Sequence, residues 1–466
     1  MPIVGAFAMA HPPLIIPDVG KGREREIAKT VASCDEVGRR IAALKPQTIV
    51  VSSPHTTMYR DYFHISPGHA AQGSFANYGA PRAAYRTIYD TEFVDALCRR
   101  CDKESIPAGT DYERDARLDH ATMIALHFIQ KFYTDFEVVR IGLSGFSPAE
   151  HYRLGRAVQE TARELDRRVV WLASGDLSHK LLADGPYGFA PEGPVFDKRI
   201  TDDFARGDFV DVLAMDHVLA ERAAECGLRS FQMMVGAFHR TRVESELLSY
   251  EGPFGVGYGV AAFEPAGEEG ESCGCDRLAS YLDARAKELQ ERKAREDAYV
   301  RLARTALETY VREGRVIAVP ADLPEELLRR RAGCFVSLKV DGALRGCMGT
   351  IEPIQESLAE EICRNAITAS TRDPRFHAVR VDELDDLVYD VDVLTEPEAI
   401  ASPDELDPSR FGVIVSAPDG RRGLLLPDLD GVDTVEEQLG IAAQKGHIDL
   451  DFDDYTLERF EVVRHL

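Results

Sequence analysis

The stretch Ile3-Val-Gly-Ala-Phe-Ala-Met-Ala-His11-Pro12-Pro13 decides the fold of the N-terminal half of the chain. Its apolar run, bounded by a turn, predicts a buried strand. Because proline lacks a donor N–H and holds an extended backbone, the strand has to end at Pro12 and Pro13. His11 therefore lies at the carboxyl end of the first strand, the edge at which open α/β sheets bind their ligands.

The overall composition excludes several classes of partner. The chain has 466 residues and a formal net charge of −24 at pH 7, which argues against nucleic acid or an anionic membrane as its main partner. No apolar run approaches the roughly 18–20 residues that span a bilayer, and the N-terminus lacks the basic region of a signal peptide. The nine cysteines are scattered and odd in number, which favours the reducing cytoplasm over a disulfide framework. The composition leaves the oligomeric state open, a homo-oligomer included.

A second strand repeats the pattern of the first. Thr48-Ile-Val-Val-Ser-Ser-Pro54-His55 is a β-branched run that ends in a proline and a histidine. A single histidine of this kind is most simply a hydrogen-bonded structural residue. Two strands that end in histidine at corresponding places instead predict that His11 and His55 share a metal ion.

Strands and helices alternate along the rest of the N-terminal half. Residues 168–174 predict another buried strand, followed by a glycine turn and His179, and residues 118–120 open a helix at Asp119-His120. This alternation predicts an α/β domain over residues 1–265, with a mainly parallel sheet and helices on both faces.

The composition changes after this domain. Residues 266–285 include a polar, acidic and glycine-rich stretch, which is typical of a linker, and one or two amphipathic helices are expected over residues 277–313. Residues 286–466 form a second predicted domain, in which Asp341-Gly342 marks a hairpin turn. The order of strands and helices predicts an α+β domain with an antiparallel or mixed sheet.

One motif of the second domain carries reactive groups. Leu344-Arg345-Gly346-Cys347-Met348-Gly349 places a cation and a thiol between glycines. Arg345 beside Cys347 could lower the pKa of the thiol or hold an anion. Alternatively, Gly346 and Gly349 build a bulge, and Cys347 is a small buried residue. The sequence leaves both interpretations open.

The histidines of the first domain predict a particular metal chemistry. Two histidines and one carboxylate are the ligands of non-haem Fe(II) sites that keep positions open. A small aromatic substrate of the catechol type and dioxygen can take those positions. His179 is placed to act as the base, since an imidazole exchanges protons near neutral pH. His120 could orient oxygen or stabilise negative charge on it.

Four motifs in residues 1–265 resemble the class III (LigB-like) extradiol ring-cleavage dioxygenases. In chain order they are Ala10-His11-Pro12-Pro13, Ser53-Pro54-His55-Thr56, Leu118-Asp119-His120 and Ser174-Gly175-Asp176-Leu177-Ser178-His179. The resemblance implies that His11 and His55 bind iron. It also implies that His179 is the catalytic acid and base and that His120 supports it.

The third metal ligand differs between two branches of this resemblance. The dioxygenases supply a glutamate late in the domain, and Glu225 is the candidate for that iron ligand. The adjacent Cys226-Gly227 instead resembles the Memo-like branch, in which ring cleavage is not the expected activity. Cys226 is therefore the alternative ligand, and its thiolate would favour a softer metal such as zinc or copper, or a redox role.

The C-terminal third resembles the AMME-syndrome candidate-gene (AMMECR) family, on residues 344–350 and on Asp373-Pro374-Arg375-Phe376. The fusion of both domains resembles the A-type proteins of the AmmeMemoRadiSam group, whose name joins this domain to a Memo-like protein and a radical SAM enzyme. The resemblance implies a radical SAM protein as a partner. The leading expectation is an Fe(II)-dependent extradiol dioxygenase-like protein. The second is a metal-binding adaptor or redox component that serves the radical SAM partner.

Overall fold

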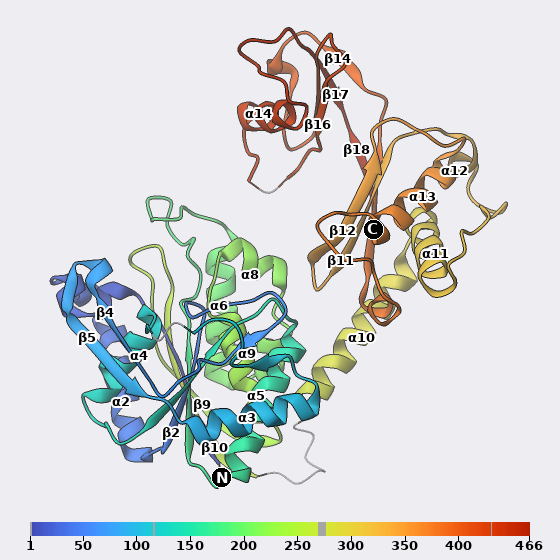
Figure 1. Cartoon of the computed structure of the whole chain (residues 1–466). Helices are drawn as coiled ribbons and strands as arrows, with labels where there is room; N and C mark the ends of the chain where they lie inside the picture. Colours follow the sequence, from blue (N-terminus) through green and yellow to red (C-terminus); the bar gives the residue numbers. More distant parts are fainter. Residues whose placement is uncertain (1, 115–116, 269–275, 430) are drawn as a thin grey trace. The chain divides into compact units, whose positions relative to one another are not determined.

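The structure is a computed structural model that describes residues 2–114, 117–268, 276–429 and 431–466. The chain forms two compact units, Met1–Ala286 and Lys287–Leu466, and each is described by itself (Figure 1). Within the described residues, no helix combines the length and the apolar character needed to cross a membrane.

A six-stranded sheet forms the centre of the first unit, in the order β7-β2-β8-β1-β10-β9. The first four strands in this order pair in parallel, whereas β10 is antiparallel to β1 and to β9. The predicted mainly parallel sheet is therefore confirmed, with an antiparallel pair at one edge. The strands are β1 (Ile3–Met9), β2 (Thr48–Ser53), β7 (Glu137–Gly142), β8 (Val169–Ser174), β9 (Thr241–Glu251) and β10 (Tyr258–Glu268).

Helices cover both faces of this sheet, as predicted. Alternate residues of β8 show this, since Val170 and Leu172 are buried in one core and Trp171 and Ala173 in the other. Successive side chains of a strand point to opposite faces, so a strand covered on both sides is apolar throughout. The first core includes α2 (Ala28–Leu44) and α4 (His120–Gln130), and the second includes α3 (Thr91–Glu104), α5 (Pro148–Glu164), α6 (Glu192–Arg206) and α9 (Leu228–Gly236).

Shorter elements complete the first unit. The strands β3 and β6 pair in parallel, and β4 and β5 form an antiparallel hairpin. These elements are β3 (Phe63–His64), β4 (Ala70–Phe75), β5 (Ala80–Ile88), β6 (Ala108–Gly109), α1 (Pro17–Gly20), α7 (Phe209–Leu213), α8 (His217–Ala223) and 3-10 helices at Pro13–Ile15, Arg23–Ile27 and Ala76–Tyr78.

Three neighbouring parallel strands end at one edge of the sheet. Met9 at the end of β1 is level with Ser174 at the end of β8, and β2 ends beside them at Ser53. Because parallel strands share their carboxyl edge, the residues that follow them in the chain are brought together. His11 and His55 are two such residues, each placed two positions beyond its strand.

The predicted linker over residues 266–285 is only partly described. Residues 269–275 lie outside the described residues, whereas residues 266–268 belong to β10. The chain then continues as α10 (Arg277–Arg295) and α11 (Ala298–Glu313). The expectation of one or two helices over residues 277–313 therefore corresponds to two.

The second unit contains two antiparallel four-stranded sheets, in the orders β12-β11-β13-β18 and β14-β17-β15-β16. α11 and α13 pack on the first sheet and α14 on the second, which confirms the predicted α+β class. The strands are β11 (Cys334–Val340), β12 (Ala343–Thr350), β13 (Val388–Leu394), β14 (Glu398–Ile400), β15 (Gly412–Ser416), β16 (Arg422–Leu425), β17 (Thr456–Phe460) and β18 (Val462–His465). The helices are α12 (Glu325–Arg329), α13 (Leu358–Thr371) and α14 (Val435–Lys445), with 3-10 helices at Val381–Asp386 and Pro403–Glu405.

The hairpin between β11 and β12 turns at the predicted place. Asp341 and Gly342 both have positive φ angles, of 52° and 79°. Two consecutive residues of this conformation match the right-handed twist of the flanking strands, and Asp-Gly accepts it at little cost.

Candidate metal centre

His11 is held rigidly at the end of β1. Its backbone N–H donates to the Asp176 Oδ1 atom at 2.7 Å, and its Nδ1 atom lies 2.9 Å from the Ser174 Oγ atom. Both partners come from the end of β8 or the residues directly after it. With Nδ1 engaged, the Nε2 atom of this buried ring is the nitrogen left to face the site.

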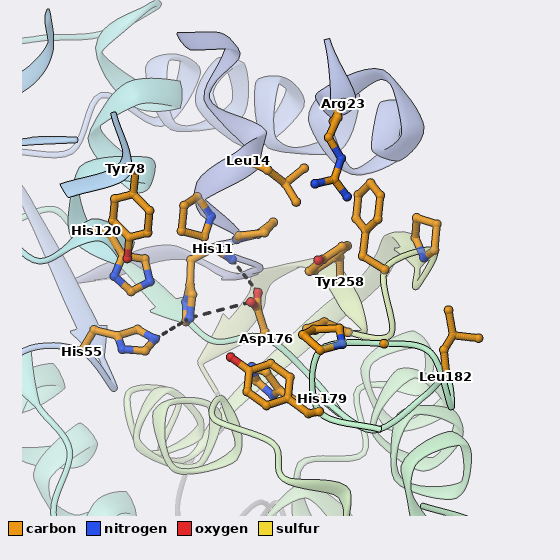
Figure 2. A pocket seen from close by; sticks show the side chains of 18 of the residues that line it. His11, Leu14, Arg23, His55, Tyr78, His120, Asp176, His179, Leu182 and Tyr258 are labelled. Carbon is orange, nitrogen blue, oxygen red and sulfur yellow. Dashed lines mark hydrogen bonds and ion pairs between the residues drawn. The ribbon is translucent and has the colours of Figure 1, made fainter. Parts of the chain in front are cut away.

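His55 completes a pair of facing ring nitrogens. Its Nε2 atom lies 3.0 Å from the Nε2 atom of His11, and the two rings meet edge to face (Figure 2). Burial lowers the pKa of both imidazoles, and nearby histidines lower that of His11 further. Two neutral nitrogens that point at each other require a proton or a cation between them. This arrangement therefore fits a bound metal ion.

Cys226 brings a sulfur atom to the same place. Its Sγ atom lies 3.6 Å from the His11 Nε2 atom and accepts a hydrogen bond from the Asp176 N–H at 3.3 Å. The candidate ligand atoms of His11, His55 and Cys226 all lie within 4.8 Å of one another. With metal–ligand bonds of about 2.0 Å to nitrogen and about 2.3 Å to sulfur, a tetrahedral ion separates its ligand atoms by roughly 3.3–3.6 Å. The 3.6 Å separation of the Cys226 Sγ and His11 Nε2 atoms lies in this range, and the 3.0 Å separation of the two histidine nitrogens is slightly shorter. The three side chains are therefore a candidate set of metal ligands.

The proton of the Cys226 thiol competes with such an ion. Burial raises the pKa of this thiol well above its usual value, and the neighbouring Asp176 raises it further. Metal binding would therefore release a proton from Cys226. Burial also raises the pKa of Asp176 to about 7, and its Oδ2 atom lies 4.0 Å from the His11 Nε2 atom.

Glu225, the predicted third ligand, is directed elsewhere. Its Oε2 atom accepts a hydrogen bond from the Leu228 N–H at 2.6 Å, at the start of α9. Burial raises the pKa of this carboxyl to about 7. The group of ligand atoms that the structure brings together contains Cys226 and not Glu225.

A crossing of two glycines brings Cys226 to the sheet edge. A Cβ atom on Gly175 would lie 2.1 Å from the Gly227 Cα atom, a distance that no side chain can occupy. The turn after β8 and the loop before α9 therefore pass each other in backbone contact. This crossing sets Asp176 and Cys226, the neighbours of the two glycines, against each other.

His120 lies beside both His11 and His55, with ring centroids 5.5 and 4.2 Å away. It is the first residue of α4. Asp119, which caps the helix, accepts hydrogen bonds from Ser53 at 2.9 Å and from the Thr122 N–H at 2.9 Å. The end of β2 and the start of α4 are thereby fixed to each other. Burial lowers the pKa of His120 to about 4, with a contribution from His55.

His179 faces the same cavity from a clamped turn. The preceding Ser178 donates its N–H to Asp197 at 2.7 Å and its hydroxyl to the Ala223 carbonyl at 3.0 Å. The His179 ring meets the ring of Tyr187 edge to face at 5.2 Å. Burial lowers the pKa of His179, so that the neutral form prevails near pH 7.

A cavity of about 790 Å³ lies at this site (Figure 2), and Cys226 is not among its lining residues. All four predicted histidines contribute to its wall, and so do residues that the sequence did not single out. The further lining residues include Asp176, Arg23 and the aromatic side chains Tyr78, Tyr187, Phe254 and Tyr258. A cavity of this size and lining can enclose a small aromatic molecule.

The motif of the second unit is engaged in structural contacts. The Arg345 guanidinium forms a two-pronged ion pair with Glu383, at 2.9 and 3.0 Å. Cys347 donates its N–H to Asp373 at 2.9 Å, and burial raises the pKa of its thiol. These contacts favour the structural interpretation of the motif over an activated thiol.

The two glycines of this motif allow close packing. A Cβ atom on Gly346 would lie 2.5 Å from the Ala369 carbonyl oxygen, and one on Gly349 would lie 2.4 Å from the Phe335 ring. Side chains at either position would push β12 away from α13 or β11.

Comparison with known families agrees with this architecture. Residues 5–261 match the family described as the catalytic LigB subunit of aromatic ring-opening dioxygenase, and residues 300–465 match the AMMECR1 family. The chain therefore belongs to the LigB family and carries a C-terminal AMMECR1 domain.

Among its relatives, the chain is similar over its whole length to protein CA_C1420 of Clostridium acetobutylicum. The two are 41% identical over 474 residues, which cover 100% of this chain and 99% of the relative. A Thermotoga maritima protein is 54% identical over 171 residues, which cover 36% of this chain and 98% of that protein. The solved structure of Pyrococcus horikoshii PH0010 covers 36% of this chain and 88% of its own, with 36% identity and a TM-score of 0.33.

Proposed function

We propose that the N-terminal domain is a metal-dependent oxidoreductase of the ring-opening dioxygenase type, acting on a small aromatic substrate and dioxygen. The observation that carries this proposal is the 3.0 Å separation of the His11 and His55 Nε2 atoms, with the Cys226 sulfur beside them, at a cavity with aromatic walls. Membership of the LigB family supports the class of reaction.

His11, His55 and Cys226 would hold the metal ion, for which Fe(II) is the first candidate. When bound, such an ion supplies redox chemistry and a Lewis acid that both oxygens of a catechol can chelate. A thiolate ligand also suits zinc or copper, so the identity of the metal is part of the test.

The residues around the ligands would prepare them for this role. Ser174 contacts the Nδ1 atom of the His11 ring, and Asp176 holds the His11 backbone N–H. Burial keeps the His11 and His55 imidazoles neutral, so that each has a lone pair to offer. Partners of this kind commonly set the affinity of a metal site, because they fix ring orientation and tautomer.

His179 and His120 would handle protons and charge in the cavity. A neutral His179 can accept the proton of a phenolic hydroxyl and return it later. His120, also neutral and beside His55, would orient oxygen or stabilise negative charge that develops there.

Metal content and oxygen uptake of the full chain would test this proposal. The protein, prepared without oxygen and reconstituted with Fe(II), should bind close to one ion and consume oxygen when a catechol is added. His179→Ala should keep the ion and lose turnover, whereas His11→Ala/His55→Ala should lose both. The matched control is His127→Gln, since His127 bonds to Tyr85 outside the cavity lining. Absence of bound metal after reconstitution would contradict the proposal.

A second function is favoured by the position of Cys226. A thiolate ligand suits a metal-binding redox component, and the attached AMMECR1 domain is compatible with service to a radical SAM partner. In this case no ring is cleaved. Co-purification with a radical SAM protein that survives Glu225→Gln but fails with Arg345→Ala would favour this function. Catechol-dependent oxygen uptake that requires His179 would favour the first.

A further inference from the structure

A buried ion pair lies at the start of α4, outside the lining of the cavity. The Nη1 atom of Arg140, in β7, is 3.5 Å from the Oδ2 atom of Asp119, the residue that caps α4. The two side chains are only 4% and 7% exposed, and neither residue lines the cavity. A charge buried to this depth needs a partner of opposite sign.

Two further contacts fix the Arg140 guanidinium. Its Nε atom donates to the Ser66 hydroxyl at 2.7 Å, and its Nη1 atom donates to the Arg117 carbonyl at 2.8 Å. Both acceptors are uncharged. Among the described residues, Asp119 is the only acidic side chain that forms an ion pair with Arg140. The positive charge is therefore held in one place, beside one carboxylate.

Asp119 connects Arg140 to the backbone of His55. The Ser53 hydroxyl donates to the Asp119 Oδ1 atom at 2.9 Å and accepts the His55 N–H at 3.1 Å. Because a carboxylate has no proton to donate, the Ser53 hydroxyl has to be the donor in its bond to Asp119. The lone pairs of this hydroxyl then remain available to the His55 N–H.

The same carboxylate holds the start of the helix that carries His120. It accepts hydrogen bonds from the Thr122 N–H at 2.9 Å and from the Thr122 hydroxyl at 2.7 Å. Burial alone would raise the pKa of Asp119, but Arg140 and the hydrogen bonds from Thr122 and Ser53 hold this pKa below its usual value. Without the Arg140 charge, the buried carboxylate would take up a proton or draw in water. Either change would disturb the bonds that fix Ser53 and Thr122.

We infer that Arg140 is a positioning residue of the metal centre, which acts through Asp119 and Ser53 on the backbone of His55. The inference rests on the part of the proposed function in which His55 is a metal ligand. Loss of a partner outside the ligand set commonly lowers metal affinity by about 10–100-fold. We expect the loss of affinity in Arg140→Met to lie in this range.

Two measurements on the full chain test the inference. The first is the affinity for Fe(II), measured without oxygen against a chelator of known affinity. The second is hydrogen exchange, in the metal-free protein, of the peptide that contains the His55 amide. Arg140→Met should lower the affinity and speed the exchange, and Arg140→Lys, which keeps the charge, should lie between this variant and the wild type. The matched control is Arg100→Met, which should keep both wild-type values, because Arg100 pairs with three glutamates of α3 and α5.

A second substitution tests the route through Asp119. Asp119→Asn removes the charge that Arg140 compensates, and an amide oxygen can still accept hydrogen bonds. The effect of Arg140→Met on both measurements should therefore be smaller in the Asp119→Asn background than in the wild type. An equal effect in both backgrounds would assign Arg140 to its contacts with Ser66 and Arg117 and overturn the inference. If Arg140→Met alone does not fold, the double variant should fold, since it buries no unpaired charge; a double variant that also fails to fold would overturn the route through Asp119.

The outcomes separate this inference from the proposed function. A wild-type chain that binds no Fe(II) would contradict the proposed function, whereas the exchange at His55 would still decide the role of Arg140. Arg140→Met with the affinity and the exchange of Arg100→Met would overturn the inference and leave the proposed function as it is.

Discussion

The Nε2 atoms of His11 and His55 lie 3.0 Å apart, although 44 residues separate them in the chain. Two parallel strands carry them to one edge of the sheet. There Ser174 contacts the His11 ring, and the Ser53 hydroxyl accepts a hydrogen bond from the His55 backbone N–H. The pair is therefore formed by the fold before any ion binds. A preorganised pair of ligands spends little free energy on ordering when metal arrives.

The three candidate ligands should differ from Glu225 in their effect on metal binding. Cys226→Ala should lower metal affinity by more than tenfold, since loss of an outer partner alone costs about 10–100-fold. Glu225→Gln should retain the metal, because the Glu225 carboxylate bonds to the Leu228 N–H instead. Competition with a chelator of known affinity measures both. The reverse order of effects would restore Glu225 as the third ligand.

The hydroxyl of Ser174 should raise the metal affinity of the site, although it is not itself a candidate ligand. Ser174→Ala removes the contact to the His11 Nδ1 atom, at 2.9 Å, and leaves the ring free to turn. We expect metal affinity to fall by about 10–100-fold with the fold intact. Ser249→Ala is the control, since the Ser249 hydroxyl has no hydrogen-bond partner in the described part of the chain. Equal affinity in the two variants would contradict the role of Ser174.

Asp197 should make the first unit less stable as pH rises through 6. Burial raises its pKa from 3.8 to about 6. Between these values the unfolded chain loses the proton and the folded chain keeps it. The contribution of the protonated Asp197 carboxyl to the free energy of unfolding is therefore fully present below about pH 4. It declines by at most about 1.4 kcal/mol per pH unit up to about pH 6.

Asp197→Asn should make this dependence less steep, while the buried Asp176 and Glu225 continue to contribute to it. An amide can still accept from the Ser178 N–H and bond to the Tyr250 hydroxyl, which contact the carboxyl at 2.7 and 2.6 Å. Urea unfolding at several pH values, followed by fluorescence of Trp171, the one tryptophan of the chain, measures the change. Asp202→Asn, at a half-exposed position of the same helix, should keep the wild-type slope. An unchanged slope in Asp197→Asn would contradict the assignment.

Gly175→Ala should weaken metal binding, because it forces apart the two backbone segments that hold Asp176 and Cys226 together. Its Cβ atom would lie 2.1 Å from the Gly227 Cα atom, so the two segments have to separate. We expect weaker metal binding, together with faster alkylation of Cys226 in the metal-free protein. Gly440→Ala is the control for adding a methyl group to a glycine, because a Cβ atom there meets nothing within 4 Å and the φ angle of Gly440 is not positive. Wild-type affinity in Gly175→Ala would show that the loop can move without consequence.

Much of the fold follows from local patterns in the sequence. The apolar runs before His11 and His55, each stopped by proline, predict strands that end at the same edge, and the structure has them there. The hairpin at Asp341-Gly342 follows from the same kind of local rule. These features depend on a few neighbouring residues, and so they can be predicted without knowledge of the tertiary structure.

The third ligand and the far end of the cavity do not follow from such patterns. Cys226 reaches His11 only because Gly175 and Gly227 meet across the fold, a contact that no local pattern reveals. Arg23 belongs to the cavity because its short helix folds back near the sheet edge. The resemblance of Cys226-Gly227 to the Memo-like branch was the sequence signal for the thiol, and it left Glu225 and Cys226 as alternatives.

The Gly175–Gly227 crossing brings together ligands from two different kinds of segment. Both histidines follow strands of the central sheet, whereas Cys226 lies in the segment between α8 and α9, outside that sheet. Replacement of Cys226 by an oxygen-bearing residue would exchange a soft sulfur ligand for a hard oxygen ligand beside His11 and His55. No strand of the sheet would have to change. A substitution in this one loop would therefore change the kind of ligand atom at the candidate site and leave the central sheet as it is.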